Sequence, residues 1–340
     1  MPLNLQPIAE WTDVTEDVFR NQIATRYQPA VLRGLVRQWP AVQQARESDL
    51  AVCRYFAGMD SGAQVDVIMT PHEVQGRVFY NATLTGFNYL RNQLPLTQVM
   101  EQVLRYAAFP NPPAVAVQSA LLSACAPAFE AAHAMPLLPS TVHPRIWLGN
   151  CIITPAHIDE SNNIACVVAG KRRFTLFPPD QISNLYLGPL DNTPTGSPIS
   201  MVDFAKPDLE RFPNFKHALA AAQVAELEPG DAIYIPSLWW HHVQSLAKVN
   251  VLVNYWWRAG GVDDDKFRSA FDALMLALVN MKDLPAPYRK AWGDIFKHYV
   301  FESSPELLAH IPPEQHGVLG EMSPQHEAEV RAWLAGRLKS

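Results

Sequence analysis

The stretch from about residue 145 to residue 257 consists of short runs of β-branched and aromatic residues separated by Pro, Gly, Asn and Asp. Runs of this kind predict short strands joined by turns. The runs are Ile146-Trp147-Leu148, Cys151-Ile152-Ile153, Ile164 to Val168, Arg173 to Phe177, Ala232 to Ile235 and Val249 to Trp257. Because many short strands in succession bury their side chains as a sandwich or a barrel, this stretch predicts a mainly β core.

The sequence on either side of this stretch favours helices. Before it, residues 10–27, 46–60, 95–108 and the Ala-rich run 120–134 have helical character, with strand-like segments at 30–32 and 65–68. After it, apolar residues recur three and four positions apart in two stripes on either side of a Pro-rich break. The stripes are Phe267, Phe271, Leu274, Leu278 and Met281, and then Tyr288, Trp292, Ile295 and Tyr299. We therefore expect an N-terminal α/β region over 1–140, the β core over 141–260, and a C-terminal helical region over 261–340. The helices of this last region either cover the β core or pair with a second copy, and we predict a homodimer.

Composition excludes several classes of protein. The 340 residues carry 27 Lys and Arg against 33 Asp and Glu, a formal charge of −6, which argues against binding nucleic acid through bulk charge. The four cysteines form no C-x-x-C pair, so a zinc site of the usual spacing is not expected. No basic start followed by an apolar run, and no run of about 18 apolar residues, is present. We expect a cytoplasmic protein with reduced thiols and no membrane contact.

A candidate metal site lies in the β-rich stretch. His157 and Asp159 are two positions apart, so in an extended strand both side chains leave the same face. A third donor is offered by His241, which follows a turn and strand with Gly230 and Pro236 at fixed spacing. Two histidines and one carboxylate hold non-haem Fe(II) and leave coordination positions open. Taken alone, His-x-Asp favours a simple hydrogen bond within a strand, but together with the turn-strand-His element it favours the metal.

The other histidines of the region have simpler interpretations. His242 faces away from His241 if the backbone is extended, so we expect it to be a packed or surface residue. His143 and His217 have no partner in the pattern and are expected to be structural.

A second candidate feature is the basic strand that begins at Lys171. Period-2 alternation places Arg172 on one face with Phe174 and Leu176, and Lys171 and Arg173 on the other. An arginine on the interior face would be a buried cation, which is costly unless an anion meets it. A dicarboxylate cosubstrate would supply that anion. The alternative interpretation is a solvated basic run at the start of a strand.

These residues stand in motifs that resemble those of the JmjC or cupin-like family of Fe(II)- and 2-oxoglutarate-dependent oxygenases. Within the family, the stretch from 154 to 257 is similar to the asparaginyl hydroxylase that acts on hypoxia-inducible factor. The matching motifs are Pro29 to Gly34 with Trp39-Pro40, Thr154 to His157, Phe177 to Gln181, Pro207-Asp208, Glu210 to Phe215, Pro229 to Asp231, Tyr234 to Pro236 and Trp239 to His242.

The resemblance implies a double-stranded β-helix, or jelly roll, flanked by N-terminal and C-terminal helices. It implies Fe(II) bound by His157, Asp159 and His241, with 2-oxoglutarate as cosubstrate. It also implies that Thr154, Asn163 and Asn254 line the cosubstrate pocket. Arg172 stands where the family usually has a lysine for the distal carboxylate, and its planar fork makes the same charge pairing.

The resemblance also includes departures. Ala116 stands in place of a tyrosine that assists in the asparaginyl hydroxylase, and Pro198-Ile199 in place of the Arg-Gln pair that holds the target asparagine. The implied function is therefore hydroxylation of a protein side chain or a small molecule, with succinate and CO2 as coproducts. A catalytically inactive cupin-like binding or scaffolding module that keeps a metal is the alternative, and a zinc-dependent cupin isomerase is a third. We expect substrate to approach over residues 160–162 and 186–204, with Trp239 or Trp240 shielding the site.

Overall fold

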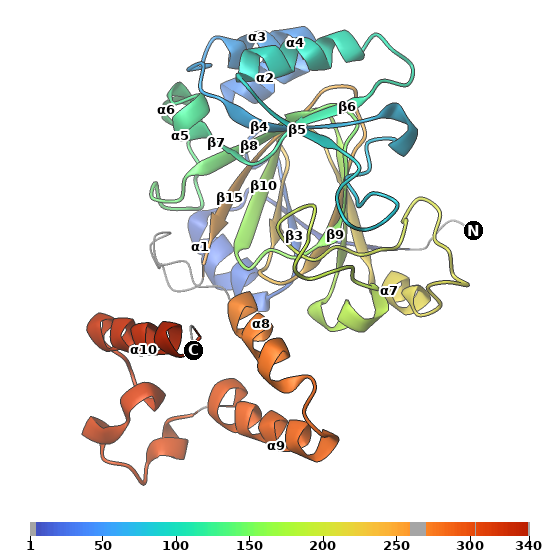
Figure 1. Cartoon of the computed structure of the whole chain (residues 1–340). Helices are drawn as coiled ribbons and strands as arrows, with labels where there is room; N and C mark the ends of the chain where they lie inside the picture. The colour runs from blue at the N-terminus through green and yellow to red at the C-terminus, as the bar shows by residue number, and fades with distance from the viewer. Residues whose placement is uncertain (1–4, 259–269, 303, 339–340) are drawn as a thin grey trace. The chain divides into compact units, whose positions relative to one another are not determined.

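The computed structural model describes residues 5–258, 270–302 and 304–338, and the chain divides into two units, Met1–Phe267 and Arg268–Ser340 (Figure 1). The strands of the first unit are β1 Gln6–Pro7, β2 Ala9–Thr12, β3 Ala30–Arg33, β4 Val65–Thr70, β5 Leu90–Leu94, β6 Ala114–Val117, β7 Ala120–Leu121, β8 Pro144–Gly149, β9 Ile153–His157, β10 Asn162–Ala169, β11 Arg172–Phe177, β12 Gln223–Leu227, β13 Ala232–Ile235, β14 Trp240–Ser245 and β15 Asn250–Trp257. Its helices are α1 Glu16–Val18, α2 Pro40–Glu47, α3 Asp49–Ala57, α4 Leu96–Tyr106, α5 Leu122–Cys125, α6 Ala128–Ala132 and α7 Phe215–Ala221.

The strands form two sheets that face each other. The large sheet has the order β2-β3-β13-β10-β15-β8-β6-β4-β5, with β7 paired to β8, and the small sheet has the order β1-β12-β11-β14-β9. A cluster of apolar side chains from both sheets fills the space between them, including Phe174 and Leu176 from the small sheet and Ala165 and Val167 from the large one. The expectation of a mainly β jelly-roll core with flanking helices is confirmed.

Strand β10 shows why the sequence folds in this way. Its residues from Ile164 to Ala169 are apolar without alternation and all are buried. Ala165 and Val167 point between the sheets, whereas Ile164, Cys166 and Val168 belong to the cluster on the outer face. Helices α2, α3 and α4 contribute to that outer cluster, and Figure 1 shows them grouped over this end of the large sheet. A strand that is covered on both faces needs apolar residues on both, so its sequence does not alternate between apolar and polar residues.

The N-terminal region is part of the β core. Strand β1 pairs with β12 of the small sheet, and two residues later β2 pairs with β3 of the large sheet. Ile8 lies at this crossing and is buried between the sheets. Strands β4, β5 and β6 extend the large sheet beyond β8. Strands from before and after residue 140 therefore belong to the same hydrogen-bonded sheet, although the sequence predicts a boundary between regions there.

Two segments differ in detail from the sequence-based expectation. The segment from residue 10 was expected to be helical, but β2 occupies Ala9–Thr12 and helical turns follow only from Glu16 to Arg26. The Ala-rich run 120–134 forms strand β7 and two short helices in place of one long helix. In both cases pairing with a distant strand, β3 or β8, overrides the local helical pattern.

The second unit is helical. It contains α8 Ala270–Met281, α9 Ala286–Phe296 and α10 Pro324–Arg337. Helix α8 carries the first expected apolar stripe, except that Phe267 lies outside the described residues. Helix α9 carries the second stripe up to Ile295, and Tyr299 lies in the π-helical turn Lys297–Phe301 that follows. None of the described side chains of residues 270–338 is buried. Across the described part of the chain, all four cysteines are free, and a search for a helix of membrane-spanning length and hydropathy finds none.

The turn before β11 depends on Gly170. Its φ angle is +75°, in the region that favours glycine, and a Cβ atom built there would lie 2.3 Å from the carbonyl oxygen of Val249. This turn joins β10 to β11 and so sets the register that places Arg172. A side chain at residue 170 is excluded by both backbone conformation and contact.

We expect Gly170→Ala to lower the thermal stability of the protein more than Gly196→Ala. Gly196 also has a positive φ, +82°, but no atom lies within 4 Å of the position that its Cβ would take. The control should cost about 1 kcal/mol for backbone strain alone, whereas Gly170→Ala should cost at least about 2 kcal/mol, because the neighbouring strand must also move. Thermal unfolding followed by circular dichroism measures both, and equal shifts in melting temperature would contradict this account of the turn.

Candidate metal centre

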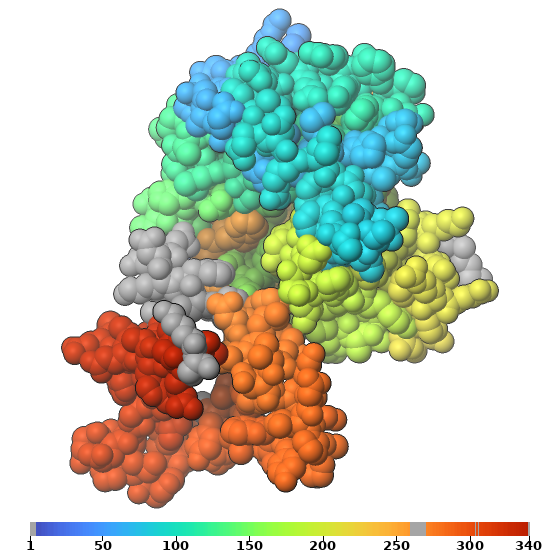
Figure 2. Space-filling model, in the orientation of Figure 1, coloured from blue at the N-terminus to red at the C-terminus, as the bar shows by residue number. Residues whose placement is uncertain are grey.

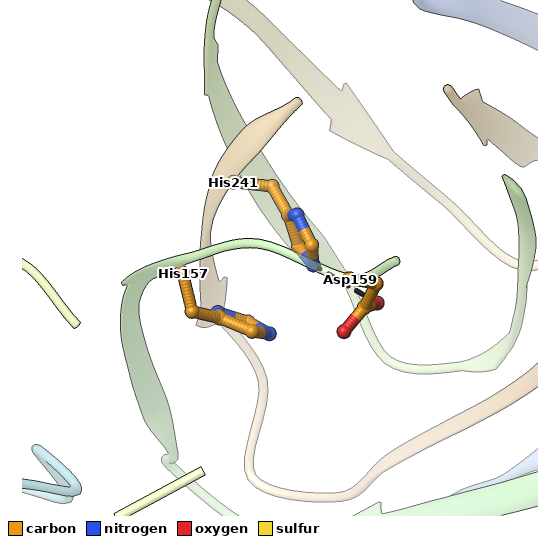
Figure 3. A group of neighbouring side chains, drawn as sticks. All are labelled: His157, Asp159 and His241. Atoms are coloured by element: carbon orange, nitrogen blue, oxygen red, sulfur yellow. Dashed lines mark ion pairs between the residues drawn. The ribbon is translucent and has the colours of Figure 1, made fainter. Parts of the chain in front are cut away.

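The pairing of β9 with β14 brings the first two candidate ligands together. His157 is the last residue of β9 and lies directly opposite His241 near the start of β14. Asp159 follows two residues beyond the end of β9. The three side chains converge, as Figure 3 shows, and each offers a ligand atom within 4.8 Å of the others. The predicted grouping of His157, Asp159 and His241 is therefore what the geometry displays.

Backbone carbonyls fix the orientation of both imidazoles. Nδ1 of His157 lies 2.9 Å from the carbonyl oxygen of Pro155, and Nδ1 of His241 lies 3.0 Å from that of Trp239. A carbonyl only accepts, so each Nδ1 carries a proton, and the neutral ring of His157 has its lone pair on Nε2. This is the arrangement in which a histidine is held ready for a metal by a partner on its other nitrogen.

Asp159 is held by two donors. Its Oδ2 lies 3.5 Å from Nε2 of His241 and accepts a hydrogen bond of 3.1 Å from Nε1 of Trp256. The sequence analysis did not identify Trp256. The available signal was its position in β15, two residues after Asn254 and therefore on the same interior face.

The three groups perturb one another electrostatically. Burial, reinforced by the nearby His241, lowers the pKa of His157 to about 4. Burial alone would lower the pKa of His241, but the hydrogen bond and charge of Asp159 outweigh it and raise that pKa. Burial alone would raise the pKa of Asp159, but its bonds to His241 and Trp256 and the charges of the histidines bring it below the usual value. The site therefore favours an ionised carboxylate beside a neutral His157, and both can bind a cation.

Arg172 lies in the same interior, as the alternation predicts. It is opposite Ser245 of β14, four positions along β11 from Leu176, which is opposite His241. The side chain is 8% exposed, and its Nε has no hydrogen-bond partner among the described residues. Burial is the cause that lowers its pKa to about 10. No carboxylate in the described part of the chain forms an ion pair with Arg172, so the interior holds an uncompensated cation.

Three polar side chains expected in the cosubstrate pocket also lie in the described core. Asn254 donates from Nδ2 to Oδ1 of Asn163 at 3.2 Å, and its own Oδ1 accepts from Nε1 of Trp147 at 2.8 Å. Asn163 and Asn254 are both buried. Thr154 is opposite Val243, and between this pair and the His157–His241 pair lie two residues of β9 but only one of β14. That bulge keeps Thr154 on the same face as His157 despite their odd spacing.

The segment 186–204 borders the site. The backbone NH of Ser200 donates to the carbonyl of Ala156, next to His157, at 2.8 Å. The hairpin around residues 79–89 contacts the same segment: Tyr89 donates to the carbonyl of Pro194, and Asn192 to that of Leu84. Figure 2 shows this cyan hairpin against the yellow-green surface. Two segments that are distant in sequence thus form one rim beside β9.

The remaining aromatic and histidine residues have mainly packing roles. Trp239 lies in the cluster between the sheets and Trp240 in a separate outer cluster, and both indole NH groups donate to backbone carbonyls. His242 is opposite Thr175, on the face away from His241, as the sequence predicts, and it is buried. His143 and His217 are exposed.

The donor set fits a divalent first-row metal such as Fe(II). Two neutral imidazole nitrogens and one carboxylate oxygen form the two-His-one-carboxylate set, which leaves coordination positions open for other ligands. A fully closed structural zinc site needs four protein ligands, and the group found in the described residues has three.

Comparisons with known proteins agree with the fold. Residues 15–261 match the profile of a family described as the cupin-like domain. The chain is similar to HSPB1-associated protein 1 homolog of Danio rerio, with 35% identity over 119 residues that cover 33% of this chain and 24% of that protein. It is also similar to Lysine-specific demethylase JMJ31 of Arabidopsis thaliana, with 36% identity over 103 residues, 30% of this chain and 18% of that protein.

A longer match is JmjC domain-containing protein D of Dictyostelium discoideum, 26% identical over 245 residues, which are 68% of this chain and 52% of that protein. The matches to the first relatives cover a quarter or less of their length. The family profile covers most of this chain, and two of the similar proteins, both from Dictyostelium discoideum, are named JmjC domain-containing proteins. The chain therefore belongs to the cupin-like, JmjC-type domain family.

Proposed function

We propose that the protein is an Fe(II)- and 2-oxoglutarate-dependent oxygenase that hydroxylates a protein side chain or a small molecule. The observation that carries this proposal is the convergence of His157, Asp159 and His241, with Nδ1 of each histidine held by a backbone carbonyl. When bound, Fe(II) would supply the oxidative chemistry by which O2 and 2-oxoglutarate give a hydroxylated substrate, succinate and CO2. The protein contributes binding, orientation and a shielded interior.

Arg172 would bind the far carboxylate of the cosubstrate. Four positions on one strand correspond to about 13 Å, so Arg172 and the residue opposite His241 are well separated along β11. The long arginine side chain and a short dicarboxylate would together span this distance inside the sandwich. The carboxylate would neutralise the buried guanidinium through two parallel hydrogen bonds. This accounts for a buried cation that the described chain leaves unpaired.

The neutral polar side chains of the interior would orient the cosubstrate. Hydrogen bonds link Trp147, Asn254 and Asn163 and hold their side chains in fixed positions. Thr154 offers a hydroxyl on the metal-facing side of β9. Trp256 keeps one oxygen of Asp159 occupied, which restricts how that carboxylate can rotate. Groups held in this way are preorganised for binding.

The substrate would approach over residues 160–162 and the segment 186–204, which borders β9. The name of the Arabidopsis relative indicates demethylation of lysine, so a methylated lysine side chain is one candidate within the protein class. Ala116 and Pro198-Ile199 are buried, small or apolar, and offer no charged group to grip a substrate amide.

The alternative function is a catalytically inactive cupin-like module that retains a metal. Two observations favour it: Arg172 replaces the lysine usual in the family, and Ala116 is a buried residue beside Gly149 with no hydroxyl to offer. The two functions differ in turnover and in cosubstrate binding, so the variants described below distinguish them.

We also propose that the chain acts as a homodimer in the cytoplasm, joined through residues 270–338. The apolar stripes of α8 and α9 leave Leu274, Tyr288, Trp292 and Ile295 exposed, and no described side chain of this unit is buried. A helical unit of this kind gains stability by covering its apolar faces, and a second copy presents the same faces.

Loss of one metal ligand should abolish turnover. We expect His157→Ala to bind Fe(II) or Mn(II) roughly 100-fold or more weakly, because one of three protein donors is lost, and to form no succinate from 2-oxoglutarate above background. His217→Ala, the same substitution at an exposed histidine, is the matched control and should be unaffected. Metal titration and a succinate assay measure the two effects. Metal affinity in His157→Ala equal to that of the wild type would contradict the assignment of the ligand.

Arg172 should matter for binding and not for stability. We expect Arg172→Met to weaken 2-oxoglutarate binding about 10- to 100-fold, the value of a charged hydrogen-bond pair, while Arg172→Lys retains much of it. Without cosubstrate, Arg172→Met should be at least as thermally stable as the wild type, because a buried, unpaired cation is removed. Lys171→Gln, on the outer face, is the control. Calorimetry and thermal unfolding provide the data, and a destabilised Arg172→Met with unchanged binding would assign Arg172 a purely structural role.

Charges on the apolar stripes should separate the dimer. We expect the double variant Leu274→Glu/Ile295→Glu to be monomeric at micromolar concentration, because the buried charges would lose their hydration without partners. Asn280→Glu, on the opposite face of α8, should remain dimeric. Light scattering coupled to size-exclusion chromatography gives the masses. A wild-type protein that is monomeric under the same conditions would refute the dimer.

A further inference from the structure

A second cavity lies on the reverse side of the small sheet. It has a volume of about 330 Å³, and the outward-facing residues of β9, β11 and β14 line one wall. His242 and Thr175 are paired across β14 and β11 on this wall, whereas the adjacent pair His241 and Leu176 faces the interior. The cavity is therefore separated from the metal centre by the sheet itself. Its size is at the lower end of the range for small-molecule sites.

His242, which lines the cavity, has a ring nitrogen without a partner among the described residues. The His242 side chain is 8% exposed, and its Nδ1 makes no hydrogen bond with any described residue. Phe204 stacks on the ring at 4.6 Å with an interplanar angle of 18°, which fixes the imidazole plane. A shielded ring nitrogen without a partner is unfavourable, so this part of the wall is not arranged for stability alone.

Two arginines from distant segments face the same cavity. Arg77 is anchored by donating to the carbonyls of Met201 and Val202, and its nearest carboxylate, Asp203, is 4.0 Å away. Burial lowers the pKa of Arg77, and the charge of Asp203 only partly offsets this effect. Arg173 also lines the cavity. Its Nε and one terminal nitrogen donate to the carboxylate of Glu226, a residue that does not line the cavity. The wall thus carries two cations and one carboxylate.

The rest of the wall is largely apolar. Ile153, Val202, Phe204 and Leu219 all line the cavity, so a ligand would bury a hydrocarbon or aromatic body against them. Water alone in the cavity would leave these apolar surfaces wet. A dicarboxylate with a short body would satisfy the arginines but would place its second charge against the apolar wall.

We propose that this cavity binds a small monocarboxylate with an apolar body, distinct from the cosubstrate of the metal centre. Its carboxylate would lie between Arg77 and Arg173 and its body over Phe204 and Leu219, beside the ring of His242. The site does not depend on the proposed oxygenase activity, since none of its lining residues is a proposed ligand of the metal or of the cosubstrate.

Benzoate binding to the full-length protein tests this proposal. We expect saturable binding of one benzoate per chain by calorimetry, and at least tenfold weaker binding of benzyl alcohol, which has the same ring without the charge. Arg77→Gln, which removes a cation, and Ala205→Trp, which fills the cavity from an exposed position, should each weaken benzoate binding at least tenfold. Arg20→Gln, at an exposed arginine elsewhere, should have no effect.

Arg172→Met separates this site from the cosubstrate pocket, because it should leave benzoate binding unchanged while weakening 2-oxoglutarate binding. Three results would each overturn the proposal: no saturable benzoate binding to the wild type, equal binding of benzyl alcohol, or loss of benzoate binding in Arg172→Met. If Arg77→Gln fails to fold, Ala205→Trp still tests the proposal. A melting temperature of Ala205→Trp equal to that of the wild type would show that this variant is folded. Full benzoate affinity in folded Ala205→Trp would also overturn it.

Discussion

The antiparallel pairing of β9 with β14 is the constraint on which the candidate site depends. It places His157 opposite His241, and two residues of chain beyond the strand are enough to bring Asp159 to the same point. Because side chains alternate along a strand, a slip of one residue in this register would turn His241 outward and His242 inward. The bulge at β9 adds a second requirement, since it keeps Thr154 on the interior face. The site is thus a consequence of sheet register, and two facing sheets with a packed interior maintain that register.

The interior of the sandwich is unusual in its polarity. Apolar side chains such as Phe174 and Leu176 share it with a buried arginine, two asparagines and the three candidate ligands. The asparagines satisfy each other and Trp147, so their burial costs little. Arg172 has no such compensation in the described chain, and a fold selected for stability alone would replace it with an apolar residue. The proposed cosubstrate would supply the anion that the described chain does not.

Much of the site could be predicted from the sequence because it depends on strand periodicity. The separate faces of His241 and His242 and the inward direction of Arg172 follow from the alternation along extended segments. Asp159 lies beyond the end of β9, so strand alternation alone does not account for its place beside His157. Other features depend on contacts between segments distant in sequence. The strand at Ala9–Thr12 exists because β3 pairs with it, and the cavity behind the small sheet needs Arg77 and Phe204 to come together on β14. Trp256 was missed because a tryptophan in a core strand usually only packs.

The most direct measurement of the central claim is a crystal structure of the protein grown without oxygen in the presence of Mn(II) and 2-oxoglutarate. The account predicts one anomalous scattering peak bound by Nε2 of His157, Nε2 of His241 and an oxygen of Asp159. It also predicts density for the cosubstrate that extends from this peak to the guanidinium of Arg172. A metal bound elsewhere, or an interior in which Arg172 faces no anion while the cosubstrate is bound at another place, would contradict it.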